Sequence, residues 1–277
     1  MTIEITAVQK IQEVPALLTI PNSRIAAGGT TFDQNTSEEL RLIDISGLEG
    51  LDGIKQKGSR IELGALTKLQ TMGESALLKT YAPALAEAAA NAGTADVRER
   101  GTLGGNLCAV RIGDTAPALL ASGAKLTIKT DSDFRELLID RFWDQNGKND
   151  LQYDEWITRI TVQIPKEERW GAAYGKIGEW DLETDPIAAA AVQLGIDGKN
   201  NITSIRGGLR LGTNNIRRMF ALEKVLKNRP ATEENLEKAV KAMAPAAQNR
   251  MDETEFTDFL LDIVRRSLTM VQERRML

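Results

Sequence analysis

Two short segments with paired glycines could bind an anion through their backbone, Ile25-Ala-Ala-Gly-Gly-Thr-Thr-Phe32 and Arg100-Gly-Thr-Leu-Gly-Gly-Asn106. Glycine permits positive φ angles and lets a phosphate approach the main chain closely. Successive N–H groups in such a turn form a concave site with positive partial charge, and the threonines beside both pairs add hydroxyl donors. Two such sites on separate segments predict a ligand that is held from two sides, such as a diphosphate. A dinucleotide cofactor is therefore the first hypothesis.

The surroundings of each glycine pair decide between a binding loop and an ordinary tight turn, which glycine pairs usually mark. The first pair follows the apolar run Ile25-Ala-Ala27, which is typical of a buried strand. The second follows an alanine-rich helix and precedes Asp114, which is placed to accept ribose hydroxyls. Neither segment fits G-x-G-x-x-G at the start of a helix, and the sequence contains no G-x-x-x-x-G-K-[ST]. The pattern favours binding loops, but not a Rossmann domain or a P-loop.

Size and charge limit the class of protein. The chain has 277 residues and a mass of 30.4 kDa, enough for one large domain or two modest ones. A net charge of −4 and a pI near 5.3 argue against nucleic-acid binding, which calls for basic patches. No apolar run approaches the ~20 residues of a membrane span, and no signal-peptide pattern opens the sequence. We therefore expect a cytoplasmic protein without membrane contacts.

Missing residue types exclude several kinds of site. The sequence has no histidine, so His-based triads and imidazole metal sites are excluded. The single cysteine, Cys108, can form neither an internal disulfide nor an iron–sulfur site, which needs about four ligands. We interpret Cys108 as a small buried residue in a strand. We expect no metal site and no catalytic side chain on this chain.

Hydrophobic patterns predict the elements. A first amphipathic helix begins near Thr6, with Pro15 weakening its end, and a long alanine-rich helix covers 77–92. A further helix covers 114–122, and strands cover 24–27, 40–45, 59–63, 125–129 and 156–164. The polar break after Pro165 is the best candidate for a domain boundary. Beyond it, strands at 188–196 and 201–211 form a hairpin around Asp197-Gly198, and three helices cover 214–226, 232–243 and 255–272.

With these motifs the chain resembles the FAD-binding medium subunit of the molybdenum hydroxylases, the group that contains xanthine, carbon monoxide and nicotinate dehydrogenases. The family's A-G-G-T/Q-S/D-L loop appears as Ala27-Gly-Gly-Thr-Thr-Phe32. Its R-N-x-G-T-x-G-G-N segment and following S-D pair appear as Arg98-Glu-Arg-Gly-Thr-Leu-Gly-Gly-Asn106 and Gly113-Asp114. Leu63-Gly-Ala-Leu-Thr-Lys68 is similar to the family's I-G-A-L-T strand and turn.

The resemblance implies an α+β fold in two parts. Residues 1–167 would form a two-subdomain FAD-binding domain of the vanillyl-alcohol-oxidase/PCMH type. Residues 168–277 would form a smaller α+β domain with an antiparallel sheet and three helices. In the family the two glycine loops hold the FAD diphosphate, an aspartate binds a hydroxyl, and an apolar residue and a lysine lie at the isoalloxazine. The matching positions here are Ala26, Ala27, Gly28, Gly29, Thr30, Thr31, Phe32, Thr102, Gly104, Gly105, Asn106, Asp114, Ile157 and Lys176.

The implied role is electron relay. FAD on this oxidoreductase subunit would pass electrons from a small [2Fe-2S] subunit to an external acceptor, while a large molybdopterin-binding subunit oxidises the substrate. One departure is the loop at 179–185, where acidic residues replace the arginine pair of the family's K-x-x-x-R-R-x-x-D-I-A segment; this leaves the acceptor open. Alternatives are a self-sufficient flavoenzyme of the UDP-N-acetylenolpyruvoylglucosamine reductase type and a non-enzymatic assembly protein that keeps the fold.

Overall fold

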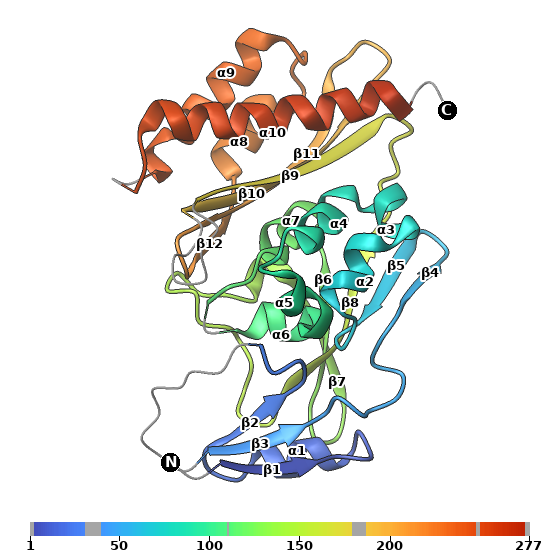
Figure 1. The fold of residues 1–277 in the computed structure, drawn as a ribbon. Coiled ribbons are helices and arrows are strands. Elements are labelled where there is room, and N and C mark those ends of the chain that lie inside the picture. Colours follow the sequence, from blue (N-terminus) through green and yellow to red (C-terminus); the bar gives the residue numbers. More distant parts are fainter. Residues whose placement is uncertain (1–2, 31–39, 110, 179–186, 248–249, 275–277) are drawn as a thin grey trace.

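The computed structural model describes residues 3–30, 40–109, 111–178, 187–247 and 250–274, and its elements form three sheets with helices between and above them (Figure 1). A parallel sheet lies at one end of the molecule. A five-stranded antiparallel sheet with a cluster of short helices occupies the middle. A four-stranded antiparallel sheet under three further helices lies at the other end.

The terminal parallel sheet has the strand order β1-β3-β2, built from β1 (Ile3–Ala7), β2 (Ser23–Ala26) and β3 (Leu40–Asp44). The predicted helix from Thr6 is wrong, because β-branched Ile3, Ile5 and Thr6 suit a strand and pair in parallel with β3. The helix of this region is α1 (Glu13–Leu18). Pro15 lies in the first turn of α1, where backbone N–H groups have no acceptor within the helix, so the missing N–H of proline costs no hydrogen bond there.

The middle sheet has the order β4-β5-β8-β6-β7. It consists of β4 (Ile54–Lys57), β5 (Arg60–Gly64), β6 (Lys125–Lys129), β7 (Phe134–Leu138) and β8 (Trp156–Gln163). Short helices join its strands: α2 (Leu69–Glu74), α3 (Ala76–Tyr81), α4 (Pro83–Ala90), α5 (Ala95–Arg100), α6 (Leu103–Cys108) and α7 (Thr115–Ser122). The strands predicted at 24–27, 40–45, 59–63, 125–129 and 156–164 and the helix at 114–122 are confirmed.

The long helix predicted over 77–92 is two helices, α3 and α4, which break at Ala82. Proline has no N–H to donate and disfavours a helical conformation in the preceding residue. Ala82 is accordingly non-helical, with φ −147° and ψ 55°, and Pro83 starts the new helix. The interpretation of Cys108 as a strand residue is also wrong, because Cys108 ends α6.

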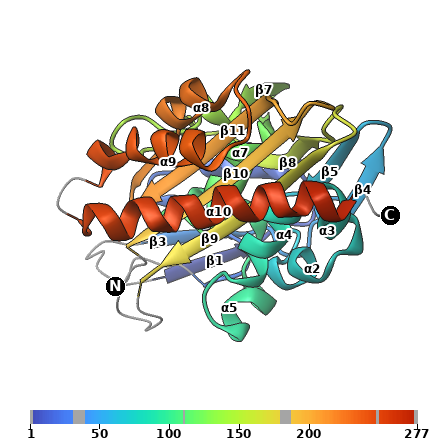
Figure 2. The same ribbon diagram turned by 90° about the horizontal axis from the view of Figure 1, so that it is seen from above.

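The C-terminal sheet has the order β12-β11-β10-β9. Its strands are β9 (Trp170–Ile177), β10 (Ala188–Ile196), β11 (Ile202–Leu211) and β12 (Asn215–Arg218). The β10–β11 hairpin confirms the prediction around Asp197-Gly198. The helix predicted over 214–226 is wrong in its first half, which forms β12; only α8 (Phe220–Leu226) is helical. The helices α9 (Glu233–Lys241) and α10 (Glu253–Arg274) are confirmed, and α10 crosses the sheet (Figure 2).

The C-terminal sheet is buried on both faces. Val192, Leu194 and Leu209 pack in one core with α8, α9 and α10. Ala189 and Ala191 pack on the other side, in the core that also contains side chains of α4 and α7. The predicted domain boundary between residues 167 and 168 stays a prediction. The strand β10, which follows this boundary, shares a hydrophobic core with α4 and α7, which precede it.

The helix α7 lies directly on β11. A Cβ built on Gly208 would be 2.2 Å from the carbonyl oxygen of Pro117, so only glycine allows this approach. Helix α7 is buried along its whole length. Over the part of the chain that the structure describes, we find no helix long and apolar enough to cross a membrane.

We predict that Gly208→Ala destabilises the fold by about 1–3 kcal/mol, since the added methyl group overpacks the α7–β11 contact. Urea unfolding measures the change. Gly198→Ala is the matched control, because no heavy atom lies within 4 Å of its added Cβ and its φ is not positive. Equal stability of the two variants would contradict the close contact.

Candidate functional site

A cavity of about 310 Å³ opens between the N-terminal sheet, α6 and β8. Most of the predicted binding residues line it, namely Ala26, Ala27, Gly28, Gly29, Thr30, Thr102, Gly104, Gly105 and Ile157. Thr31, Phe32 and the acidic loop at 179–185 lie outside the described residues. The fold thus brings the two glycine segments to one cavity although they belong to different sheets and helices.

The two glycine segments touch each other through the backbone. A Cβ built on Gly28 would lie 2.2 Å from the carbonyl oxygen of Arg100, and Gly29 has a positive φ of 63°. Arg100 Nη2 donates to the carbonyl oxygen of Gly29 at 3.5 Å. Gly28 is therefore needed for the close contact between the segments, and Gly29 suits the positive φ.

The backbone donors of the second segment are already used. The N–H of Gly104 donates to Ala65 O at 2.8 Å, and that of Gly105 to Thr102 Oγ1 at 3.2 Å. The N–H of Asn106 donates to Thr102 O at 2.8 Å. These N–H groups are bonded within the chain because residues 103–108 form the helix α6 and Thr102 caps it, so their contacts to a cofactor stay predictions.

The backbone N–H groups at the glycine pair of the first segment, unlike those of the second, have no acceptor among the described residues. Within the described part of the chain, no acceptor is bonded to the N–H groups of Ala27, Gly28, Gly29 or Thr30. All four residues line the cavity. Moreover, β2 is an edge strand, so alternate N–H groups along it face away from β3. This side of the cavity offers a row of backbone donors.

The remaining wall is largely apolar. Leu18, Ile25, Leu66 and Leu151 contribute to it, together with Ile157. Trp156 also lines the cavity and is 1% exposed, and its Nε1 has no hydrogen-bond partner among the described residues. The wall therefore suits an apolar part of a ligand.

Cys108 is the thiol of the cavity wall. Burial raises its pKa from 9.0 to about 12. The thiol is therefore protonated at neutral pH and is a poor nucleophile.

Glu155 provides a carboxylate in the wall of the cavity. Arg135 Nε donates to its Oε1 at 2.7 Å, Arg135 Nη2 donates to its Oε2 at 2.6 Å, and the N–H of Gln152 donates to Oε2 at 2.9 Å. The hydrogen bonds from Arg135 hold the pKa of Glu155 below its ordinary value of 4.5, against the opposing effect of burial. Glu155 is thus a fixed anion, not a proton donor at neutral pH.

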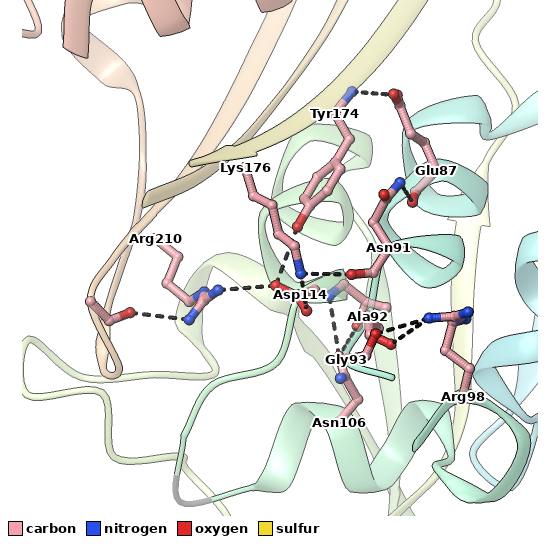
Figure 3. Close-up of polar contacts among 12 residues, drawn as sticks. Glu87, Asn91, Ala92, Gly93, Arg98, Asn106, Asp114, Tyr174, Lys176 and Arg210 are labelled. Carbon is pink, nitrogen blue, oxygen red and sulfur yellow. Dashed lines mark hydrogen bonds and ion pairs between the residues drawn. The ribbon is translucent and has the colours of Figure 1, made fainter. Parts of the chain in front are cut away.

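Three predicted residues lie outside the cavity lining, in a polar cluster between α4, α7 and the C-terminal sheet (Figure 3). Asn106 Oδ1 accepts from the N–H of Thr115 at 3.1 Å and from its hydroxyl at 2.6 Å. Asp114 forms ion pairs with Lys176 at 3.2 Å and with Arg210 at 3.0 Å. The direct cofactor contacts expected of Asn106, Asp114 and Lys176 stay predictions.

The same cluster contains a buried tyrosine. Tyr174 is 1% exposed, and its hydroxyl donates to Asp114 Oδ1 at 3.3 Å. Burial, and next the negative charge of Asp114, raise the pKa of Tyr174 well above 10. The hydroxyl is therefore a neutral donor.

Sequence reasoning missed Glu155, Trp156, Arg135 and Arg210. Glu155 and Trp156 directly precede the predicted Ile157, so their strand position was a usable signal. Arg135 and Arg210 lie far from either glycine segment in the sequence and carry no motif.

We predict that acid weakens the fold through Glu155. Its pKa is lower in the folded than in the unfolded chain, so the unfolded chain binds more protons and stability falls as the pH drops below about 4.5. Arg135→Met should reduce stability at pH 7 by about 1–3 kcal/mol and flatten this acid dependence. Urea unfolding between pH 7 and pH 3 tests both. Arg141→Met, at an exposed arginine, is the control, and parallel curves for the two variants would contradict the role of the pair.

Comparisons with known proteins agree with this geometry. Residues 1–167 match the family model of the FAD binding domain in molybdopterin dehydrogenase. The chain is 27% identical over 193 residues to the nicotinate dehydrogenase FAD-subunit of Eubacterium barkeri, covering 66% of this chain and 65% of that one. It is 28% identical over 179 residues to the xanthine dehydrogenase FAD-binding subunit of Escherichia coli O157:H7, covering 62% and 61%. The chain thus spans slightly less than two thirds of these relatives' length.

The fold matches as well. A chain of carbon monoxide dehydrogenase from Hydrogenophaga pseudoflava superimposes with a TM-score of 0.86 at 24% identity, covering 99% of this chain and 98% of that one. The structural match confirms the predicted α+β fold of the FAD-binding type. Since the family model covers more than half of the sequence, the chain belongs to the family of FAD-binding domains of molybdopterin dehydrogenases, the flavoprotein subunits of the molybdenum hydroxylases.

Proposed function

We propose that FAD binds in the cavity between the two glycine segments, with its diphosphate on the first segment. The observation that carries this proposal is the row of backbone N–H groups from Ala27 to Thr30 along the cavity, to which no described residue offers an acceptor. Backbone N–H groups are strong hydrogen-bond donors, and these four residues are half-buried or exposed where they line the cavity, so a ligand can reach them. A diphosphate would satisfy several of them at once, while Arg24, which also lines the cavity, supplies positive charge.

The other residues of the cavity fit the rest of this cofactor. Ile157 and its apolar neighbours provide an apolar wall that could contact the isoalloxazine ring, and Trp156 Nε1 is a donor that the described residues leave without a partner. Gly105 is exposed and lines the cavity. A Cβ built on Gly105 would have one heavy atom within 4 Å, Thr102 Oγ1 at 3.0 Å. We therefore assign direct FAD contacts to the residues that line the cavity.

The proposed activity is electron relay within a larger oxidoreductase. Bound FAD supplies the redox chemistry, and the chain's own residues bind it, orient it and limit the access of water. We propose that electrons arrive from [2Fe-2S] clusters of a small subunit and leave to an external acceptor, with molybdopterin on a large subunit. Several relatives are named as one subunit of a dehydrogenase, among them a carbon monoxide dehydrogenase medium chain. Residues 1–167 are the proposed FAD-binding domain, residues 168–277 the C-terminal domain, and the cytoplasm the proposed location.

We predict that Gly105→Val weakens FAD binding by more than tenfold, roughly the effect of losing one well-made contact, because the side chain would occupy the cavity. Titration of the apoprotein with FAD, followed by flavin fluorescence, measures affinity, and circular dichroism checks the fold. Gly47→Val is the control, since nothing lies within 4 Å of its Cβ. Gly104→Val should instead destabilise the fold, since a Cβ there meets Ala65 at 3.1 Å. Normal FAD affinity of Gly105→Val, or tighter binding of FMN than of FAD by the unaltered chain, would refute the site.

We also predict the composition of the native assembly. The chain purified from its own cells with an affinity tag should co-purify with two further subunits, and the complex should contain molybdenum, iron and FAD. After separation under mild conditions, this chain should retain the flavin and neither metal. Metal analysis of both fractions tests the subunit assignment. Substrate hydroxylation by the separated chain alone would overturn it.

A further inference from the structure

We propose that Arg210 positions the flavin site from the C-terminal sheet, acting through Asp114 and α7 on the second glycine segment. This inference rests on the proposed function, in that it takes FAD to bind in the cavity. Arg210 neither lines that cavity nor belongs to either glycine segment. It is a positioning residue, since it would act through other residues.

Arg210 is an arginine in the middle of a sheet. It lies on β11 opposite Ala189 of β10 and Ile216 of β12, and it is 3% exposed. A charge so deeply buried is unfavourable unless it is paired. Its Nη1 donates to Gly212 O at 3.1 Å, its Nη2 to Asp114 Oδ1 at 3.0 Å, and its Nε has no partner among the described residues. Asp114 is therefore the anion that balances this cation.

The backbone of β11 brings the arginine to one end of α7. Side chains alternate along a strand, so Gly208 and Arg210 face the same side. Gly208 lets α7 lie against β11, because a side chain there would meet Pro117 O. Two residues further on, Arg210 reaches Asp114, which immediately precedes the helix. The pair thus fixes the beginning of α7 relative to the C-terminal sheet.

Asp114 does not cap the helix that it precedes. Its carboxylate makes no capping bond, and it accepts from Arg210, Lys176 and Tyr174 of the C-terminal sheet (Figure 3). The next residue, Thr115, donates hydrogen bonds from both its N–H and its hydroxyl to Asn106 Oδ1. The N–H of Gly113 donates to Asn106 O at 3.0 Å. The start of α7 is therefore bound on one side to the C-terminal sheet and on the other to Asn106.

Asn106 completes the connection to the cavity. It lies on α6 directly after Gly105, which is exposed to the cavity, and its own N–H is held by Thr102 O. A Cβ on Gly113 would lie 2.1 Å from the side chain of Asn106, so the two segments fit closely. A shift at the start of α7 would therefore move Asn106, and with it the wall that Gly105 forms.

Arg210→Met is the decisive variant, because it removes the charge and keeps most of the length. Asp114 would keep Lys176 and Tyr174 as partners, and replacement of a buried ion by an apolar residue is often tolerated. We expect its affinity for FAD to fall roughly tenfold, within the usual range of coupling between sites. Arg210→Lys keeps the charge and should restore most of the affinity. If Arg210→Met does not fold, Arg210→Lys decides: it must bind FAD more weakly than the unaltered chain but still measurably.

Arg206→Met is the matched control. Arg206 lies on β11 two residues before Gly208 and contacts the same helix at its other end, where its Nε donates to Leu120 O at 3.2 Å. It is also ion-paired, to Asp140 at 2.6 Å, but has no link to Asn106 in the described residues. Its loss should leave FAD affinity within about twofold of the unaltered chain, the usual limit of independent sites.

A double-mutant cycle with Asn106→Ala tests the route. If Arg210 acts through Asn106, Arg210→Met should have little further effect on FAD affinity once Asn106 is alanine, whereas a general loss of stability would act in both backgrounds. Additive effects, or unchanged affinity in Arg210→Met, would overturn the inference while leaving the FAD site intact. Failure of the unaltered chain to bind FAD would instead refute the proposed function.

Discussion

The C-terminal sheet is buried on both faces, and this burial connects the C-terminal helices α8, α9 and α10 with α4 and α7 of the middle layer. A sheet covered on both sides favours strands with continuous apolar runs over strict alternation of polar and apolar residues. Ala188-Ala-Ala-Ala-Val192 of β10 is such a run, and its residues are completely buried. The alanines are small enough for helices to approach from both sides. On the side that faces α4 and α7, Lys176 and Arg210 of this sheet form ion pairs with Asp114, which directly precedes α7.

Several charged side chains at the edges of this sheet connect it to the neighbouring helices. Glu87 of α4 is bound by Arg266 of α10, while the N–H of Tyr174 donates to its other oxygen at 3.0 Å. Lys176 Nζ donates to Asn91 O at 2.6 Å, beyond the end of α4, where a cation is favourable. These contacts connect the last helix, the sheet and the helices of the middle layer. The side chains of Arg266 and Glu87 are 39% and 36% exposed, so this ion pair adds little stability, whereas the side chain of Lys176 is 10% exposed.

The sequence predicted much of the fold and the place of the site, and its failures have physical causes. The glycine segments, the β10–β11 hairpin and the last two helices follow from local chemistry, which a single sequence displays. Tertiary pairing decided the rest. Residues 3–7 form a strand because β3 is available as a partner, and β12 replaced a helical turn because β11 has a free edge there. Likewise, which N–H groups stay free depends on Ala65 and Thr102, whose positions no local pattern reveals.

The thiol in the cavity wall bears on the durability of the protein. Peroxides attack cysteine mainly as its thiolate. With a pKa near 12, Cys108 carries almost no thiolate at neutral pH. The site can therefore include a small polarisable side chain without offering an easily oxidised one. Oxidation through the thiolate is therefore expected to be slow at Cys108, although the side chain is only half-buried in the cavity wall.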